Sequence, residues 1–242
     1  MFLKIFRYNV YVGKLEKLSF SDKTIINTIN PHSYVVSKND KIFSESLVNS
    51  NYLFPDGIGI VIAAKILHNK IIKRITGADI HDHLLIKAVD KSLNIFYLGS
   101  SNKTLDLIRK KNLIKYPSLN VTYFSPPFKS KFSEDDNQTM IKKINRVKPD
   151  ILFVGMTAPK QEKWVYLNKS KIDVKIIASI GAVFDFYAGT FIRPNFFIQR
   201  IGLEWAFRFL KDPKRLFRRN FISTPLFIID LIIEKFSFFK RP

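Results

Sequence analysis

Three groups of polar and glycine residues follow apolar runs of the sequence, where side chains could carry out chemistry at one edge of a sheet. The first group is PDGIG, from Pro55 to Gly59, in which Asp56 ends an apolar run just before a glycine-rich helix start. A carboxylate in this position could act as a general base. The alternative is an aspartate that caps the helix, followed by a turn glycine. The dinucleotide-binding fingerprint is excluded, because its third glycine would fall on Ile62.

The second group is GMTAPKQEKW, residues 155–164, which indicates a strand end, a loop and a helix start. Free backbone N–H groups at a helix N-terminus bind anions. The side chain of Gln161 can both donate and accept hydrogen bonds with a sugar or a uracil edge. The alternative is that Pro159 and Glu162 are ordinary residues of a first helical turn. The third group, residues 181–189, predicts only a loop near the same edge.

Arginines at helical spacing distinguish the C-terminal part of the chain. The Asp-Pro pair at 212–213 is typical of a helix start. Arg215, Arg218 and Arg219 then fall at positions i, i+3 and i+4, on one face of that helix. Arg208 lies on an amphipathic run just before it. Planar guanidinium groups can bind a diphosphate bidentately. The alternative is a solvated basic face.

The sequence offers little for metal or sulfur chemistry. It contains no cysteine, which excludes disulfides, cysteine-ligated zinc and a cysteine nucleophile. It also contains no Asp-x-Asp, the metal–diphosphate clamp of many sugar-nucleotide enzymes, so arginine would have to neutralise a diphosphate. His81 and His83 flank Asp82, but positions two apart do not share a helix face. We therefore expect residues 81–83 to be a solvated segment, and we expect neither a metal site nor a cofactor.

Apolar runs that alternate with helical patterns predict an α/β fold with a mostly parallel, Rossmann-like sheet flanked by helices. We expect strands at 24–30, 52–54, 94–98, 121–124, 150–154 and 174–180. We expect helices at 32–48 (capped by Ser33), at 58–67, from Ser100 or Ser101 to 115, at 137–147 and from about 160. Ligands of such sheets bind beyond the carboxyl ends of the strands, which is where the three polar groups fall.

The composition changes after Gly189. Residues 193–242 carry 11 Lys or Arg, 4 Asp or Glu and 11 aromatic residues. We therefore divide the chain into an α/β core, residues 1–190, and a basic, aromatic-rich helical appendage, residues 191–242. Within the appendage, residues 226–239 place Asp230, Glu234 and Ser237 on one stripe of an otherwise apolar helix. Such a helix can lie in a membrane interface, or it can dock on the core.

The overall charge narrows the class of partner. The chain has 242 residues and a net charge of +20, which favours polyanionic partners: nucleic acid, an anionic membrane surface or phosphorylated substrates. We find no signal peptide and no run of about 18 uncharged apolar residues that could span a membrane. A basic nucleic-acid-binding or other polyanion-binding α/β protein is one alternative, and a nicotinamide-dependent oxidoreductase is another. The missing dinucleotide fingerprint argues against the oxidoreductase.

The order of these segments resembles the bacterial glycosyltransferases of the WecG/TagA/CpsF type, which include N-acetylmannosaminyltransferases. The resemblance covers roughly residues 24–220. Its segments are Thr28-Ile29-Asn30, PDGIGIVIAAK (55–65), Arg74-Ile75-Thr76-Gly77-Ala78-Asp79, Tyr97-Leu98-Gly99, VGMTAPKQEKW (154–164), IGAVFDFYAG (180–189), GLEWAFR (202–208) and Asp212-Pro213-Lys214-Arg215. No single segment is specific, but their joint order and spacing are.

The resemblance implies an inverting, metal-independent transferase that moves a sugar from a UDP-sugar to a polyprenyl-diphosphate-linked sugar. By that resemblance, the general base is Asp56. The residues that would contact substrate are Thr28, Asn30, Arg74, Gln161, Arg208, Arg215 and Arg218. The implied partners are the UDP-sugar, the lipid-linked acceptor and an anionic membrane, with no nucleic acid and with self-association left open. The implied location is the inner face of the plasma membrane, with the appendage closing over the active site.

The sequence departs from the family pattern at three places. Thr157 replaces a glycine, Ala182 replaces the second residue of a Gly-Gly pair, and the Arg-Ala-Pro element is shortened to Arg193-Pro194. All three changes fall in loops at the expected substrate edge. The donor therefore stays open among N-acetylmannosamine, its uronic acid, glucose and other hexoses.

Overall fold

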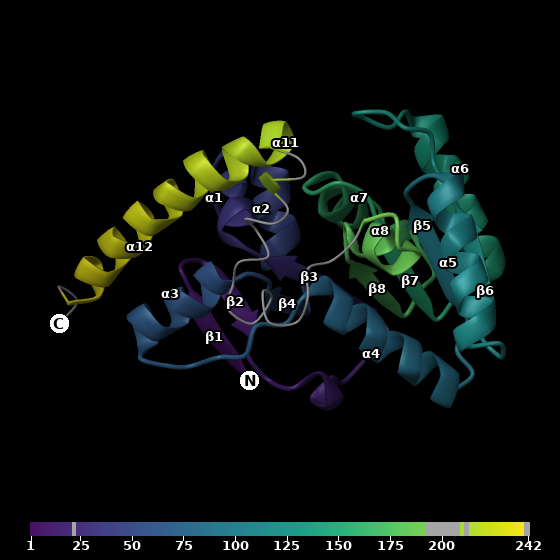
Figure 1. Cartoon of the computed structure of the whole chain (residues 1–242), viewed down its shortest axis with the longest axis horizontal. Coiled ribbons are helices and arrows are strands. Elements are labelled where there is room, and N and C mark those ends of the chain that lie inside the picture. The colour runs from purple at the N-terminus through teal and green to yellow at the C-terminus, as the bar shows by residue number, and fades with distance from the viewer. Residues whose placement is uncertain (21–22, 192–208, 211–212, 240–242) are drawn as a thin grey trace.

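The computed structural model describes residues 1–20, 23–191, 209–210 and 213–239. In this part of the chain, the strands form one eight-stranded sheet in the order β1-β2-β4-β3-β8-β7-β5-β6, with helices on both of its faces (Figure 1). Strand β1 runs antiparallel to β2, and the other neighbouring pairs are parallel. The expected α/β fold with a mostly parallel, Rossmann-like sheet is confirmed.

The six strands expected from the sequence are present, but residues 181–189, expected as a loop, contain a helix at 183–188. The strands are β1 (Phe2–Ile5), β2 (Tyr8–Tyr11), β3 (Thr24–Ile29), β4 (Tyr52–Pro55), β5 (Ile95–Gly99), β6 (Val121–Phe124), β7 (Ile151–Gly155) and β8 (Ile176–Ser179). The helices of the core are α1 (Pro31–Asn39), α2 (Lys41–Val48), α3 (Ile58–His68), α4 (Gly77–Asp90), α5 (Asn102–Lys115), α6 (Glu134–Val147), α7 (Lys160–Asn168) and α8 (Val183–Ala188). Shorter 3-10 turns are η1 (Leu15–Lys17) and η2 (Lys169–Lys171). The C-terminal part has α11 (Pro213–Phe217), the π-helical turn η3 (Arg218–Ser223) and α12 (Thr224–Phe239).

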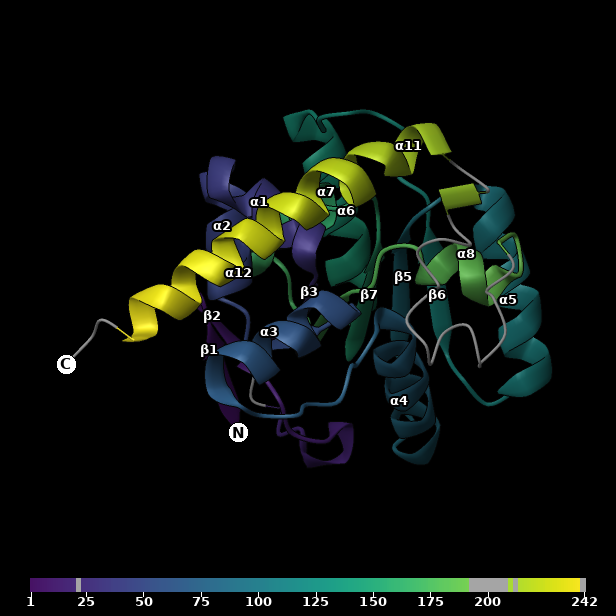
Figure 2. The same ribbon diagram turned by 60° about the vertical axis from the view of Figure 1, so that its left-hand side comes forward.

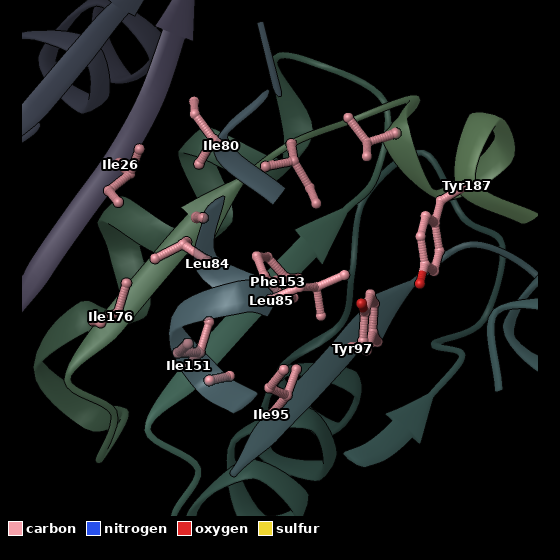
Figure 3. Close-up of a cluster of buried hydrophobic side chains, with 14 of the residues drawn as sticks. Ile26, Ile80, Leu84, Leu85, Ile95, Tyr97, Ile151, Phe153, Ile176 and Tyr187 are labelled. Carbon is pink, nitrogen blue, oxygen red and sulfur yellow. The ribbon is translucent and has the colours of Figure 1, made fainter. Parts of the chain in front are cut away.

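Both faces of the sheet are covered, which explains why the strands are continuous apolar runs. Ile151 and Phe153 of β7 pack with α4, α5 and α8, whereas Leu152 and Val154 pack with α6 and α7. Figure 3 shows the first of these clusters, with Leu84 and Leu85 of α4 among the side chains of the sheet. Helices α1, α2 and α3 cover the β1-β2-β4-β3 end of the sheet.

Two details of the first predicted helix are wrong. Residues 32–48 form two helices, because the chain breaks at Asp40, whose side chain accepts a hydrogen bond from the N–H of Phe43 and caps α2. The cap of α1 is Asn30 rather than Ser33: its Oδ1 accepts the N–H of Ser33 at 3.0 Å. Pro31 is then the first residue of the helix, a position that suits proline because it needs no N–H donor.

The expected solvated segment at residues 81–83 is also wrong. It lies within α4, and the side chain of His81 is only 1% exposed. His81 Nε2 lies 2.7 Å from the hydroxyl of Tyr97, and burial lowers the pKa of His81. Buried residues of α4 recur at helical spacing, at positions 77, 80, 81, 84, 85 and 88. This apolar stripe in the sequence predicts the helix, and it includes His81.

Helix α12 docks on the core through one face and leaves a second, apolar face exposed. Phe227 and Leu231 are buried against α1 and α3, and Asp230 pairs with Lys38 of α1 at 2.6 Å. Figures 1 and 2 show α12 lying along α1 and beside α3. Six large apolar side chains of α12 remain between 44% and 65% exposed: Leu226, Ile228, Ile229, Ile232, Ile233 and Phe236. Of the described helices, none has the length and apolar character needed to cross a membrane.

Candidate active site

Asp56 lies at the carboxyl edge of the sheet, directly after β4. The register of β3 and β4 pairs Ile29 with Pro55, and the N–H of Asp56 donates to the carbonyl of Ile29 at 2.9 Å. This bond places Asp56 beside Asn30, the residue that follows β3. The side chain of Asp56 is half-buried, so it combines a fixed backbone with access to solvent.

The neighbouring polar residues of β3 differ in what they can offer a substrate. Asn30 is half-buried, and its carbonyl oxygen already accepts the N–H of Ser33. Its amide N–H groups are therefore the part available to a ligand. Thr28 is half-buried on the strand, opposite Phe54. Gly57 has φ +121, a backbone conformation that favours glycine. A Cβ added there would lie 3.4 Å from the Cβ of Asn30.

Arg74 reaches the same edge from a segment without regular structure. The N–H of Ile75 donates to the carbonyl of Pro55 at 3.1 Å, which holds Arg74 close to the end of β4. The chain then enters α4 through a capping box between Thr76 and Asp79. A Cβ added to Gly77 would lie 3.0 Å from the carbonyl of Ile180, so the N-terminus of α4 abuts the loop after β8.

The sheet has a topological switch point where β5 and β7 end. These strands are neighbours, but the helices that follow them, α5 and α7, lie on opposite faces of the sheet. Nucleotides and other ligands of open α/β sheets bind at such a point. The two strand ends approach closely: Ser100 N–H donates to the carbonyl of Gly155 at 3.0 Å. A Cβ added to Gly99, which has φ +126, would lie 2.3 Å from that carbonyl, so only glycine fits.

Gln161 lies beside this switch point, but it is buried. Its side chain is 3% exposed in the first turn of α7. Its Oε1 accepts the N–H of Met156 at 3.1 Å, and its Nε2 donates to Glu162 at 2.8 Å. An added Cβ on Gly181 would lie 3.5 Å from Nε2, so the amide faces the loop after β8. The Gln161 side chain thus holds the loop after β7 and lies next to the loop after β8.

The C-terminal arginines approach the N-terminus of α1. His32 Nδ1 lies 2.8 Å from the hydroxyl of Ser223, which ties the π-helical turn η3 to the first turn of α1. The pKa of His32 is lowered, first by burial and then by the positive charges of Arg219 and Arg218. Because His32 is two residues from Asn30, these two arginines lie on the Asp56 side of the sheet edge. Arg208 and the side chain of Arg215 lie outside the described residues.

The predicted residues thus fall in two places along one edge. Asp56, Asn30, Thr28 and Arg74 gather at β3 and β4, with Arg218 above α1, whereas Gln161 follows β7. Three strand spacings of about 4.8 Å separate β4 from β7, a distance of about 14 Å. An elongated substrate could therefore contact both places. Among the described residues, no group of three or more His, Asp or Glu side chains is arranged to hold a metal ion.

Comparison with known proteins identifies the family. A family model described as the glycosyl transferase WecG/TagA/CpsF family matches residues 4–241. The chain belongs to this family. A relative from Bacillus subtilis (strain 168) is 27% identical over 237 residues, which cover 96% of this chain and 90% of the relative. A relative from Staphylococcus aureus (strain MW2) is 26% identical over 215 residues, or 89% and 82% of the two chains. Both are named N-acetylglucosaminyldiphosphoundecaprenol N-acetyl-beta-D-mannosaminyltransferase.

The structure of this glycosyltransferase adds His32 and Glu162, which the sequence did not single out as members of the site, and it brings in Arg219, which the sequence grouped with the other C-terminal arginines. His32 contacts Ser223 of η3. The positive charge of Arg219 lowers the pKa of His32 more than that of Arg218 does. Glu162 is 3% exposed and bonded to Gln161. A signal for Glu162 was present, because the Gln-Glu pair stands in the segment that resembles the family, but its burial is a property of the folded chain.

Proposed function

We propose that this chain is an inverting glycosyltransferase that moves a sugar, N-acetylmannosamine or a related hexose, from a UDP-sugar to a polyprenyl-diphosphate-linked sugar. The names of the two relatives, which span most of both chains, support the lipid-linked acceptor. The observation that carries the mechanism is the placement of Asp56. It is a half-exposed carboxylate at the carboxyl edge of the sheet, between Asn30 and Arg74.

In the proposed reaction, Asp56 acts as the general base. An acceptor hydroxyl attacks the anomeric carbon from the face opposite UDP, and the carboxylate of Asp56 takes the hydroxyl proton. The bond between the anomeric carbon and the diphosphate oxygen breaks, and its electron pair leaves with UDP. The result is a single displacement with inversion. A positioned base typically contributes 10²–10⁴-fold to the rate.

Cationic side chains would stabilise the departing UDP without a metal ion. Arg218 and Arg219 lie beside the N-terminus of α1, and Arg74 lies beside the end of β4. Arg208 and Arg215 complete the proposed set. Guanidinium groups aimed at developing negative charge lower the barrier because their interaction strengthens as the leaving group gains charge. The switch point between β5 and β7 is the proposed place for the nucleotide, since ligands of open α/β sheets bind at such points.

The appendage would dock the enzyme on the membrane that holds its acceptor, which we place at the inner face of the plasma membrane. Helix α12 turns its charged residues inward, where Asp230 pairs with Lys38, and leaves an apolar face outward. Exposed apolar patches of this kind mark interaction surfaces. The net charge of +20 favours an anionic surface, where each nearby Lys or Arg contributes about 1 kcal/mol.

The test is UDP release from a panel of UDP-sugars with a short-chain lipid-diphosphate-N-acetylglucosamine as acceptor, in the presence of EDTA. Turnover with one donor that is insensitive to EDTA and lost in Asp56→Asn supports the proposal and identifies the donor. UDP binding without turnover on any donor would contradict the proposed acceptor. Absence of UDP binding would contradict the proposed reaction and favour a role in binding other polyanions.

A further inference from the structure

Glu162 is a buried carboxyl group at the candidate site, and within the described part of the chain no cation pairs with it. It is 3% exposed in the first turn of α7. Its Oε1 accepts a hydrogen bond from Gln161, and its Oε2 is buried with no hydrogen-bond partner among the described residues. The ammonium group of the next residue, Lys163, pairs instead with Asp40 at 2.7 Å. The fold therefore bears the cost of an incompletely satisfied buried carboxyl.

The hydrogen bonds around Gln161 leave one orientation for its amide. The backbone N–H of Met156 can only donate, so the amide atom that faces it must be Oε1. Nε2 then faces Glu162, whose carboxyl oxygen accepts one of its two N–H groups. The remaining N–H is on the side of Gly181. This residue belongs to the loop after β8 and has no side chain.

We infer that Glu162 is a positioning residue, which fixes the amide of Gln161 and through it the loop of residues 155–159 beside the switch point between β5 and β7. This inference rests on the proposed function, because it assigns the loop to the donor site. Gln161 is then a hydrogen-bond donor toward the site, and it would recognise an acceptor atom such as a hydroxyl, carbonyl or phosphate oxygen.

The cost of Glu162 supports a functional reason for keeping it. Burial raises its pKa to about 7, against a smaller opposing effect from the hydrogen bonds of Gln161 and the backbone. A buried group that destabilises the fold at neutral pH is typical of functional sites. An apolar side chain of the same length would pack there without this cost, but it would leave the amide of Gln161 without its acceptor.

The experiment compares kcat/KM for the wild type, Glu162→Met and Glu162→Gln. Methionine keeps the length and removes the acceptor, whereas glutamine keeps a carbonyl oxygen that can accept the same N–H. We expect Glu162→Met to lower kcat/KM about tenfold, and Glu162→Gln to recover most of that loss. In a Gln161→Ala background, Glu162→Met should cause no further loss, because Glu162 acts through Gln161. Equal activity of Glu162→Met and wild type, or additive losses in the double variant, would overturn the inference.

Hydrogen exchange provides a readout that does not depend on turnover. The backbone N–H of Met156 should exchange faster in Glu162→Met, and at the wild-type rate in Glu162→Gln. Glu134→Met is the matched control, because it breaks an exposed Gln138–Glu134 hydrogen bond of the same length on α6. If the exchange prediction holds while no donor turns over, the proposed function fails and the positioning role stands. If Met156 exchange is unchanged in Glu162→Met, the positioning role fails whatever the activity.

Discussion

The two groups of predicted site residues along the sheet edge differ in how exposed they are. At the end of β3 and β4, Asp56, Asn30 and Arg74 are half-exposed on backbones that are fixed by hydrogen bonds. At the end of β7, Gln161 and Glu162 are buried and bonded to one another. The comparison teaches that residues of one predicted site need not share a role. The β4 end presents side chains that solvent can reach, whereas the β7 end carries a buried pair that is hydrogen-bonded to the loop after β7.

The largest expected effect comes from a substitution at the β4 end. Asp56→Asn removes the base but keeps the size of the side chain, so we expect kcat/KM to fall by about 10²–10⁴ with little change in the melting temperature. Steady-state kinetics and calorimetry measure both. Asp135→Asn, an exposed aspartate in the first turn of α6, is the control and should retain wild-type activity. A loss of less than threefold in Asp56→Asn would remove the base from the mechanism.

The second prediction concerns the surface that would bring the acceptor to the β4 end. Ile229, Ile232 and Phe236 share the outer face of α12 and are 51–65% exposed. Changing all three to serine removes about 1 kcal/mol of membrane burial for each, and should weaken binding to anionic vesicles about a hundredfold. Ile114→Ser is the control, because Ile114 is 85% exposed but lies on α5. Equal sedimentation of both variants with vesicles would contradict the docking surface.

The third prediction concerns the β7 end, where burial of the Glu162 carboxyl lowers the free energy of unfolding. As the pH rises from about 4.5 to about 7, an unfolded chain releases the proton of Glu162 before the folded protein does, so the free energy of unfolding decreases across this window. The cost reaches about 3 kcal/mol above pH 7. Glu162→Gln should therefore match the wild type near pH 4.5 and exceed its stability by about 3 kcal/mol at pH 8. Urea unfolding at both pH values measures this, and a constant difference would contradict it.

The smallest expected effect tests how the appendage sits over the β4 end. Arg219→Gln removes a positive charge near His32, so the pKa of His32 should rise toward its ordinary value while burial still holds it low. Titration of the imidazole by NMR measures the change. Arg109→Gln on α5, where the guanidinium lies over the ring of Tyr123, should leave the pKa of His32 unchanged. An unchanged pKa in Arg219→Gln would mean that η3 does not lie against α1 in solution.

Strands β3 to β8 were predictable from the sequence because both faces of the sheet are covered, which favours continuous apolar runs, whereas β1 and β2 lack such runs. The position of Asp56 was predictable for the same reason, since the run ends just before it. Helix α4 was not predicted, because its apolar spacing is interrupted by the polar residues 81–83. Turn signals also misplaced the cap of α1 by three residues.

The remaining features depend on contacts between distant parts of the chain. Glu162 is an ordinary first-turn residue by its local sequence, and its burial at 3% exposure is a property of the folded chain. The polar stripe of α12 was visible in the sequence, but its inward direction is set by Lys38, which lies 192 residues before Asp230. The order of the strands, which places β8 between β3 and β7, is likewise a property of the whole fold.

The anomeric configuration of the product tests the central claim most directly. With a donor that supports turnover, NMR of the purified disaccharide lipid would show the configuration of the new glycosidic bond relative to that of the UDP-sugar. A single displacement with Asp56 as base predicts inversion. Retention of configuration would contradict the account, because it would require a covalent intermediate or attack from the same face as the leaving UDP.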